Sequence, residues 1–216
     1  MKRAKRFFGL LTCFTILLNL SCQSEEECYS CSESVDTWAH ENLQIIKGMS
    51  RMDIIELPAS KQRAAFRVLS PKQRQSVIIS KLNHVYDFVK TNDEKVFINK
   101  VKEIAYQTDF SREWSDEEML ANESMLLEAS KKLNWSKEFV VYAFGTLQNM
   151  DASKDNSKDF FRKEFQNPDK DCNCNWGWCP DDSDCEESSC DETTTGCSFL
   201  LLGPCDEICN PLDLGQ

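Results

Sequence analysis

The sequence predicts an all-α fold, in which a compact multi-helix domain over residues 34–149 is followed by a small disulfide-rich irregular module over residues 172–216. Two observations predict it: helix-start motifs recur at short intervals through the middle of the chain, and eight of the twelve cysteines lie in the C-terminal module. Short connections make consecutive helices pack against one another, and roughly 115 residues are enough to bury a core. Residues 150–171 are polar and mixed in charge, which is typical of a linker.

The first two helices are predicted from apolar spacing. A helix that begins near Val35 and ends near Gly48 or Ser50 would place one set of apolar side chains on one face: Trp38, Leu43, Ile45, Ile46 and Met49. A shorter helix is expected after Pro58, because proline suits the first turn of a helix. Its apolar residues would be Ala64, Ala65, Phe66 and Leu69.

Capping motifs mark the later helix starts. Ser70-Pro71-Lys72-Gln73, Thr91-Asn92-Asp93-Glu94 and Ser115-Asp116-Glu117-Glu118 each place Ser or Thr three residues before Gln or Glu, so that both side chains can satisfy free N–H groups of the first turn. Ser136 is the expected cap of the last helix. Apolar residues recur along each helix at three- and four-residue steps: Ile78, Leu82, Val85, Tyr86 and Val89; Phe97, Val101, Ile104 and Ala105; Met119, Leu126, Leu127 and Leu133; Phe139, Val140, Phe144 and Leu147.

Residues 1–21 are predicted to be a signal peptide. Four positive charges precede an apolar run from Phe7 to Leu20, which is too short to span a membrane comfortably. A small residue, Ser21, then precedes Cys22, as lipoprotein signal peptidase requires. We therefore expect a lipidated Cys22 at the mature N-terminus, followed by an acidic tether over residues 22–33. Asn19 departs from the aliphatic residue usual at that place, and an ordinary secreted protein or a single-span anchor is the alternative.

The residues after Cys22 bear on localisation. Gln23-Ser24-Glu25-Glu26-Glu27 resembles the acidic export signal of Bacteroidetes-type lipoproteins. The resemblance implies an outer-membrane lipoprotein of the cell envelope that is exposed at the cell surface and contacts the membrane through its N-terminal lipid. A solvated acidic spacer is the alternative interpretation.

Ten cysteines remain once Cys13 leaves with the signal peptide and Cys22 is acylated. An even number of cysteines outside the cytoplasm indicates a disulfide framework, and the polar C-terminal module has too little apolar content to fold on a core alone. The sequence does not choose among the possible pairings. The disulfide candidates are Cys28, Cys31, Cys172, Cys174, Cys179, Cys185, Cys190, Cys197, Cys205 and Cys209.

No metal or other cofactor is expected. Zinc binding would need thiolates, which an oxidising compartment consumes. The acidic residues Asp182, Asp184 and Glu186 alternate like the ligands of a calcium loop, but the glycine that such a loop needs is replaced by Glu187. A solvated acidic loop is the simpler interpretation.

No enzyme activity is expected either. Cys28-Tyr29-Ser30-Cys31 has the spacing of thiol oxidoreductases but lies in the tether, so a structural disulfide is expected there. His40 and His84 are the two histidines of the chain, and both are expected at helix surfaces because they have no recognisable catalytic partners.

Charge narrows the classes of partner. Without residues 1–21 the chain has 21 basic and 36 acidic residues, a formal charge of −15, which argues against nucleic-acid binding. The C-terminal module has ten Asp or Glu and no Lys or Arg, which disfavours direct lysis of anionic membranes. An unknown protein or cell-surface partner is therefore expected.

Two apolar patches are expected at the surface of the C-terminal module. One consists of Trp176 and Trp178 on either side of Gly177, and the other is the run Phe199-Leu200-Leu201-Leu202. A small disulfide module has little interior in which to bury them. Trp176, Trp178, Phe199 and Leu200 are therefore the candidate partner-binding residues.

The cysteine order resembles that of a bacteriocin. Its spacing, with Cys179-Pro180-x4-Cys185 and Thr195-Gly196-Cys197 at matching places, is similar to fulvocin C. The whole chain resembles the bacteriocin fulvocin C-related proteins, which place a lipoprotein-type signal and a helical region with motifs of the type Leu57-Pro58, Gln62-Arg63 and Phe66-Arg67 ahead of such a tail. The chain departs from that pattern at Cys205 and Cys209, which stand three residues apart instead of one.

This resemblance implies a surface or outer-membrane lipoprotein that acts by binding rather than catalysis, with antibacterial activity as one outcome. An envelope adhesion or scaffold lipoprotein with a disulfide-stabilised recognition tip is one alternative. A precursor or immunity protein, cut in the linker between Lys163 and Lys170, is the other.

Overall fold

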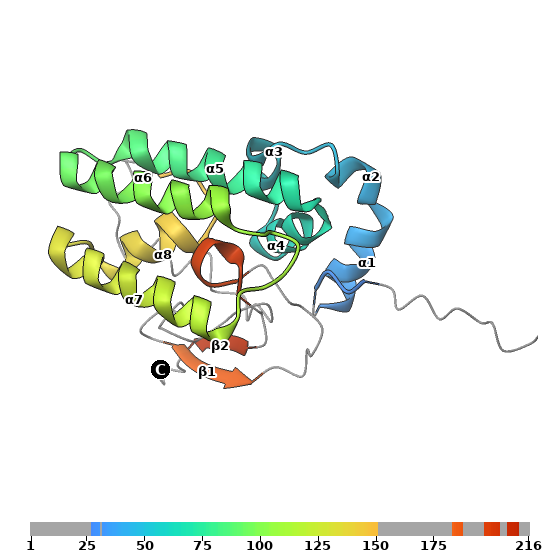
Figure 1. Ribbon diagram of the computed structural model, residues 1–216. Helices are drawn as coiled ribbons and strands as arrows, with labels where there is room; N and C mark the ends of the chain where they lie inside the picture. Colours follow the sequence, from blue (N-terminus) through green and yellow to red (C-terminus); the bar gives the residue numbers. More distant parts are fainter. Residues whose placement is uncertain (1–26, 31, 151–182, 188–196, 204–206, 212–216) are drawn as a thin grey trace, which may run out of the picture.

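The computed structural model describes residues 27–30, 32–150, 183–187, 197–203 and 207–211 (Figure 1). The predicted signal peptide, the lipidation site Cys22 and nearly all of the predicted linker lie outside these residues.

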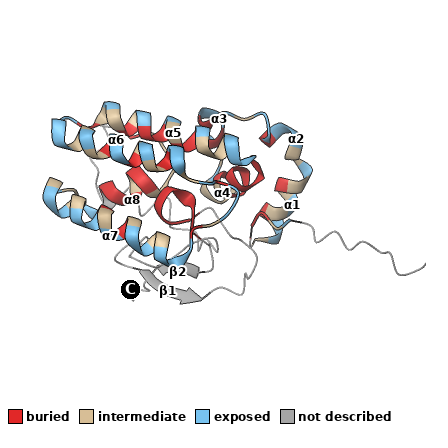
Figure 2. Cartoon of the chain, viewed as in Figure 1, coloured by how far each residue is buried: buried red, intermediate tan, exposed pale blue. Residues whose placement is uncertain are grey.

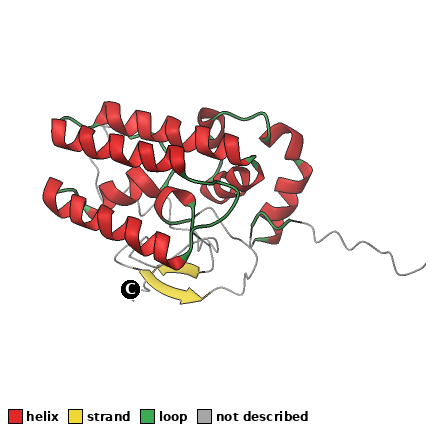
Figure 3. Ribbon diagram, viewed as in Figure 1, coloured by secondary structure: helices red, strands yellow, loops and turns green. Residues whose placement is uncertain are grey.

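Eight α-helices occupy the described part of the chain between residues 33 and 145, which confirms the predicted all-α class of the helical domain (Figure 3). The short connections bring the helices together in one compact body, as the sequence indicates. The helices are α1 (Glu33–Glu41), α2 (Leu43–Ile46), α3 (Arg51–Ile55), α4 (Ala59–Val68), α5 (Pro71–Phe88), α6 (Asn92–Gln107), α7 (Asp116–Leu133) and α8 (Lys137–Gly145).

The predicted capping residues are confirmed. Capping boxes begin α5 at Ser70, α6 at Thr91 and α7 at Ser115, and the N–H of Phe139 donates to Ser136 Oγ at 3.1 Å at the start of α8. A further capping box at Ser50 begins α3, which the sequence interpretation missed. These motifs act within a single turn, so they need no help from the rest of the fold.

The single first helix expected from Val35 onward is divided into α1 and α2 at Asn42. Asn42 has φ −112° and ψ 12°, and its side-chain amide donates to the carbonyl of Trp38 at 2.8 Å. A side chain that hydrogen-bonds a nearby carbonyl offers the backbone an alternative to the helix. The break turns Ile45 outward, where it is 62 % exposed, so the prediction that Ile45 belongs to the apolar stripe is wrong.

The long helices α5 and α6 lie side by side, and α8 and α7 lie below them in the view of Figure 1. The shorter helices α1 to α4 lie together at the right of this view. Their buried faces meet in one continuous core (Figure 2). On α7, Leu126 is fully buried but Leu127 is 38 % exposed, because consecutive residues of a helix point about 100° apart. Fully buried side chains include Phe66, Leu82, Val85, Ile98, Val101 and Leu126.

The described part of the C-terminal module contains two short strands and one turn of 3-10 helix. Strand β1 (Ser183–Glu187) pairs antiparallel with β2 (Glu207–Pro211), and Cys185 stands opposite Cys209 in the register. Between the two strands in sequence is the turn η2 (Phe199–Leu201), which lies against α8 and α7 (Figure 1).

Candidate functional site

The loop Cys197–Gly203 is closed at its neck and buried against the helical domain (Figure 2). Cys197 and Gly203 form an isolated antiparallel bridge, in which the N–H of Gly203 donates to Cys197 O at 2.9 Å and the N–H of Cys197 donates to Gly203 O at 3.3 Å. All residues of the loop are buried. The loop is therefore a compact unit and contributes directly to the core.

The prediction of an exposed apolar patch at Phe199-Leu200-Leu201-Leu202 is wrong, because all four side chains are buried. Phe199 and Leu202 are 0 % exposed, Leu200 is 1 % exposed and Leu201 is 3 % exposed. The expectation considered only the interior of the small C-terminal module, whereas these side chains find an interior in the helical domain. Phe199 and Leu200, two of the candidate partner-binding residues, are buried against this chain itself. The other two, Trp176 and Trp178, lie outside the described residues.

The ring of Phe199 lies between two aromatic rings of the helical domain. Its centroid is 5.8 Å from that of Trp114 and 5.8 Å from that of Phe144. Phe144, on α8, continues the contacts to Trp135 at 5.9 Å and to Phe97 at 6.3 Å. These tilted and edge-on arrangements are the favourable ones for aromatic pairs. The loop therefore extends an aromatic cluster that begins on α6.

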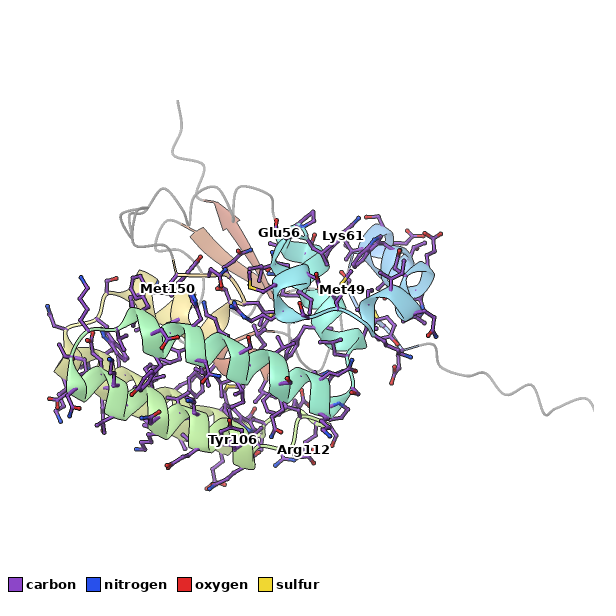
Figure 4. All side chains as sticks on the ribbon, turned by 90° about the horizontal axis from the view of Figure 1, so that it is seen from above. Met49, Glu56, Lys61, Tyr106, Arg112 and Met150 are labelled. Atoms are coloured by element: carbon purple, nitrogen blue, oxygen red, sulfur yellow. The ribbon has the colours of Figure 1, made fainter. Side chains whose placement is uncertain are left out.

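Trp114 also fixes the loop through the backbone. Its N–H donates to Leu202 O at 3.2 Å, and its own side chain is 7 % exposed. Trp114 belongs to the connection between α6 and α7, which follows the end of α6 where Tyr106 lies (Figure 4).

An ion pair holds this connection in place. Arg112 donates from both terminal nitrogens to the carboxylate of Glu118, at 2.7 Å each, and the N–H of Ser115 donates to Glu118 at 2.8 Å. The hydrogen bonds from Arg112, followed by that from Ser115, lower the pKa of Glu118 to about 2. Glu118 is therefore a carboxylate at all ordinary pH values, and it serves as both helix cap and ion-pair partner.

The backbone of the loop adopts conformations that L-residues avoid. Ser198, Leu200 and Leu201 have φ values of 61°, 55° and 58°. A left-handed conformation costs an ordinary residue about 1–2 kcal/mol, and it persists where the surrounding structure determines it. We conclude that packing against the helical domain holds the loop in this shape.

The neck of the loop approaches α7 closely at Gly203. A Cβ atom added to Gly203 would lie 2.7 Å from Ser198 Oγ, 2.8 Å from Ser198 Cβ and 3.0 Å from Met119 Cε. Such distances are shorter than real Cβ contacts, so a side chain at this position would force Ser198 or Met119 to move.

Cys197, at the neck of the loop, takes part in a disulfide bond. It is 6 % exposed, and the side chain of its partner lies outside those that the structure describes. Cys28 Sγ lies 3.3 Å from Ser30 O as a hydrogen-bond donor. Outside the described residues lie the other disulfide candidates Cys31, Cys172, Cys174, Cys179, Cys190 and Cys205, and of Cys185 and Cys209 only the backbone is described.

The N-terminal segment joins the helical domain at Tyr29. Arg67 Nη1 donates to Tyr29 O at 2.6 Å, and the N–H of Tyr29 donates to Asp36 Oδ1 at 2.6 Å. Burial and a hydrogen bond to Glu27 raise the pKa of the Tyr29 phenol to about 12. Tyr29, which lies within the predicted tether, is thus fixed to the helical domain.

Gln62 and Arg67, two polar residues of the segment between Leu57 and Arg67, have structural roles. Gln62 Nε2 donates to Leu57 O at 2.7 Å and to Ile55 O at 3.3 Å, which fixes the turn between α3 and α4. Arg67, 5 % exposed, holds Tyr29 as described. Both therefore position neighbouring segments.

The segment that leaves α8 is fixed by side chains of α3, α5 and α8. Four consecutive carbonyls of this segment, at residues 147–150, each lie at hydrogen-bond distance from a different side chain. The partners in order are Arg51, Lys81, Tyr142 and His84. We call this set the exit clamp, because it fixes the chain after α8 as far as Met150, which is labelled in Figure 4.

The exit clamp contains two buried basic side chains. Arg51 is 6 % exposed and Lys81 is 2 % exposed, and the Lys81 ammonium lies 4.6 Å from the centroid of the Tyr142 ring. Burial, and then the nearby Arg51, lower the pKa of Lys81 well below its usual value. Burial is also the main cause that lowers the pKa of His84.

The burial of Lys81 was not predicted, although its position in the sequence indicates it. Lys81 stands four residues after Val77 and four before Val85, which places it in the apolar stripe of α5. A lysine in such a stripe indicates a buried cation with a polar partner. His84, half-buried at this clamp, makes its contact with a backbone carbonyl.

The described residues include no group of three His, Cys, Asp or Glu side chains placed to hold a metal ion. None of the helices in this part of the chain is long and apolar enough to cross a membrane. The chain matches no known protein family, no curated protein and no solved structure.

Proposed function

We propose that this chain is an exported, lipid-anchored envelope protein that acts by binding and not by catalysis. Its helical domain carries the disulfide-rich C-terminal module and presents it to a target cell or to a protein partner. The observation that carries the proposal is the burial of Phe199 and its neighbours in the helical domain. A domain whose core includes part of the module is suited to hold that module in a fixed orientation.

The anchor is proposed from the N-terminal sequence. Four cations, an apolar run and Ser21-Cys22 follow in the order of a lipoprotein signal. The contact of Arg67 with Tyr29 supports a short tether, because the chain already belongs to the fold a few residues after Cys22. Such a tether would hold the helical domain close to the envelope surface.

The partner is proposed to be a protein or another cell-surface component. The acidic module disfavours anionic lipid as the primary target. Since Phe199 and Leu200 serve the internal contact, Trp176 and Trp178 remain the candidate partner-binding residues. The resemblance to fulvocin C-related proteins supports an antibacterial role, and the adhesion or scaffold role is the alternative.

Metabolic labelling with a palmitate analogue tests the anchor. We expect label on the unsubstituted chain and on Cys13→Ser, and no label on Cys22→Ser, because Cys22 is the proposed acylation site and Cys13 leaves with the signal peptide. Cys22→Ser should also appear in the soluble fraction. Label on Cys22→Ser, or its absence from the unsubstituted chain, would contradict the proposal.

Binding to intact cells tests the role of the module. We expect the oxidised full mature chain with Cys22→Ser to bind bacteria related to the producer, and Trp176→Ala with Trp178→Ala to abolish binding. Tyr106→Ala, which removes a 59 % exposed aromatic side chain of the helical domain, is the matched control and should bind normally. Binding with growth inhibition indicates a bacteriocin-type role, and binding without it favours adhesion or scaffolding. Absence of binding would contradict both.

A further inference from the structure

The Cys197–Gly203 loop satisfies most of its described backbone hydrogen bonds by itself. Its neck is closed by the two bonds between Cys197 and Gly203, and inside it the N–H of Leu201 donates to Ser198 O at 3.1 Å and that of Leu202 to Phe199 O at 3.3 Å. Among the described residues, the bond from Trp114 to Leu202 is the one backbone hydrogen bond between the loop and the helical domain. The attachment of the loop to the helical domain therefore depends little on backbone hydrogen bonds.

The contact between the loop and the helical domain is mainly apolar. Phe199 contacts the rings of Trp114 and Phe144, and Gly203 lies against the end of Met119. Apolar burial of this kind needs no covalent link, since its driving force is the area removed from water.

The loop and the helical domain are connected only distantly along the chain. Residues 151–196 separate Met150, the last residue of the exit clamp, from Cys197. The exit clamp fixes the chain up to Met150 without help from the loop, because all four of its side chains come from α3, α5 and α8. The docking of the loop is thus a long-range contact on a helical domain whose last described segment is fixed without it.

We propose that the surface formed by Trp114, Met119 and Phe144 is a non-covalent binding site for the Cys197–Gly203 loop, and that the C-terminal module stays bound after the intervening chain is cut. Proteolysis between Met150 and Ser183 then leaves the module on the helical domain. The module therefore remains with the helical domain and is not shed as a free peptide. This inference depends on the packing alone, and neither the lipid anchor nor the target enters it.

A cleavable form of the full mature chain tests the inference. The chain carries Cys22→Ser, Cys28→Ser and Cys31→Ser, so that its helical part contains no cysteine, and a site for a sequence-specific protease is inserted between Lys163 and Lys170. The chain is exported to an oxidising compartment, purified, cut completely and run on a gel-filtration column at micromolar concentration. We expect both fragments in one peak, and two separate peaks in urea. Two peaks without urea would overturn the inference.

Substitutions in the loop identify the site. In the cut chain, Phe199→Ala should weaken the affinity between the fragments by about 100-fold or more, since removing a fully buried phenylalanine ring costs that much. Leu120→Ala removes an apolar side chain of α7 that is 66 % exposed, and it should leave the affinity unchanged. If Phe199→Ala leaves the affinity unchanged, or Leu120→Ala weakens it equally, the assigned site is wrong. If Phe199→Ala does not fold, the gel-filtration result for the cut chain that keeps Phe199 still tests whether the module stays bound.

Discussion

The ring of Phe199 packs against the ring of Phe144, with their centroids 5.8 Å apart. Phe144 is in the middle of the aromatic cluster of the helical domain, whereas Phe199 belongs to the cysteine-rich C-terminal module. Their contact means that the core of the helical domain includes residues from the end of the chain. The stability of the two parts is therefore coupled.

Phe199→Ala should destabilise the whole mature chain. The side chain is 0 % exposed, and truncation of a buried phenylalanine costs about 3–5 kcal/mol because it removes apolar burial and leaves a cavity. Urea unfolding followed by circular dichroism measures the change. Leu120→Ala, at an exposed position, should change the free energy of unfolding by less than about 0.5 kcal/mol. Equal effects of the two substitutions would show that the loop is not part of the core.

Gly203→Ala should also destabilise the chain, by about 1–3 kcal/mol. The added Cβ would lie 2.7 Å from Ser198 Oγ and 3.0 Å from Met119 Cε, so the loop or α7 has to move. Gly48→Ala is the matched control, because there the nearest atom to the new Cβ is Ile45 O at 3.4 Å. Thermal unfolding of both variants measures the difference, and we expect Gly203→Ala to lower the unfolding temperature more than Gly48→Ala does.

A second substitution checks the cause of that loss. Ser198→Gly removes both nearest atoms of the clash and relieves the positive φ of Ser198. Combined with Gly203→Ala, it should recover part of the lost stability, which a double-mutant cycle measures. Strict additivity of the two substitutions would contradict the close approach.

Lys81 should make stability depend on pH. Burial lowers its pKa in the folded chain, so between that value and the ordinary lysine pKa of about 10.4 the unfolded chain binds a proton that the folded chain does not. The free energy of unfolding should therefore rise with pH by this contribution as the pH increases from the lowered pKa of Lys81 towards the ordinary lysine value. Lys81→Met should remove that slope, and Lys72→Met, at an exposed site of the same helix, should keep it. If the free energy of unfolding depends on pH in the same way for Lys81→Met and for the unsubstituted chain, the lowered pKa of Lys81 is contradicted.

Arg112→Gln should raise the pKa of Glu118 from about 2 towards its usual value, because the hydrogen bonds from Arg112 are the largest cause of the shift. A depressed carboxyl pKa contributes stability that is present above the unfolded pKa of about 4.3 and is lost as the pH falls towards 2. NMR titration of the Glu118 side-chain carboxyl measures the change. Lys132→Gln, at the other end of α7, is the control and should leave the titration of Glu118 as it is. If Arg112→Gln leaves the titration of Glu118 unchanged, the ion pair between Arg112 and Glu118 is contradicted.

The sequence by itself determined the helical class and most helix starts. Ser70, Thr91, Ser115 and Ser136 were identified from residues that lie within one turn of each other, and interactions over so short a distance are the same in any fold. The division of the first helix at Asn42 is also local, but a side chain that competes with the backbone gives a weaker signal than a capping box.

Only the tertiary structure decided which apolar and charged side chains are buried together. Phe199 and Leu200 were expected at the surface because the module around them is small, and Lys81 was not singled out because lysine is usually solvated. Both outcomes depend on surfaces contributed by distant parts of the chain: α8 and Trp114 for the loop, and the carbonyl of Gln148 for Lys81. A helix cap is decided by neighbours in sequence, whereas burial is decided by whichever surfaces the folded chain brings together.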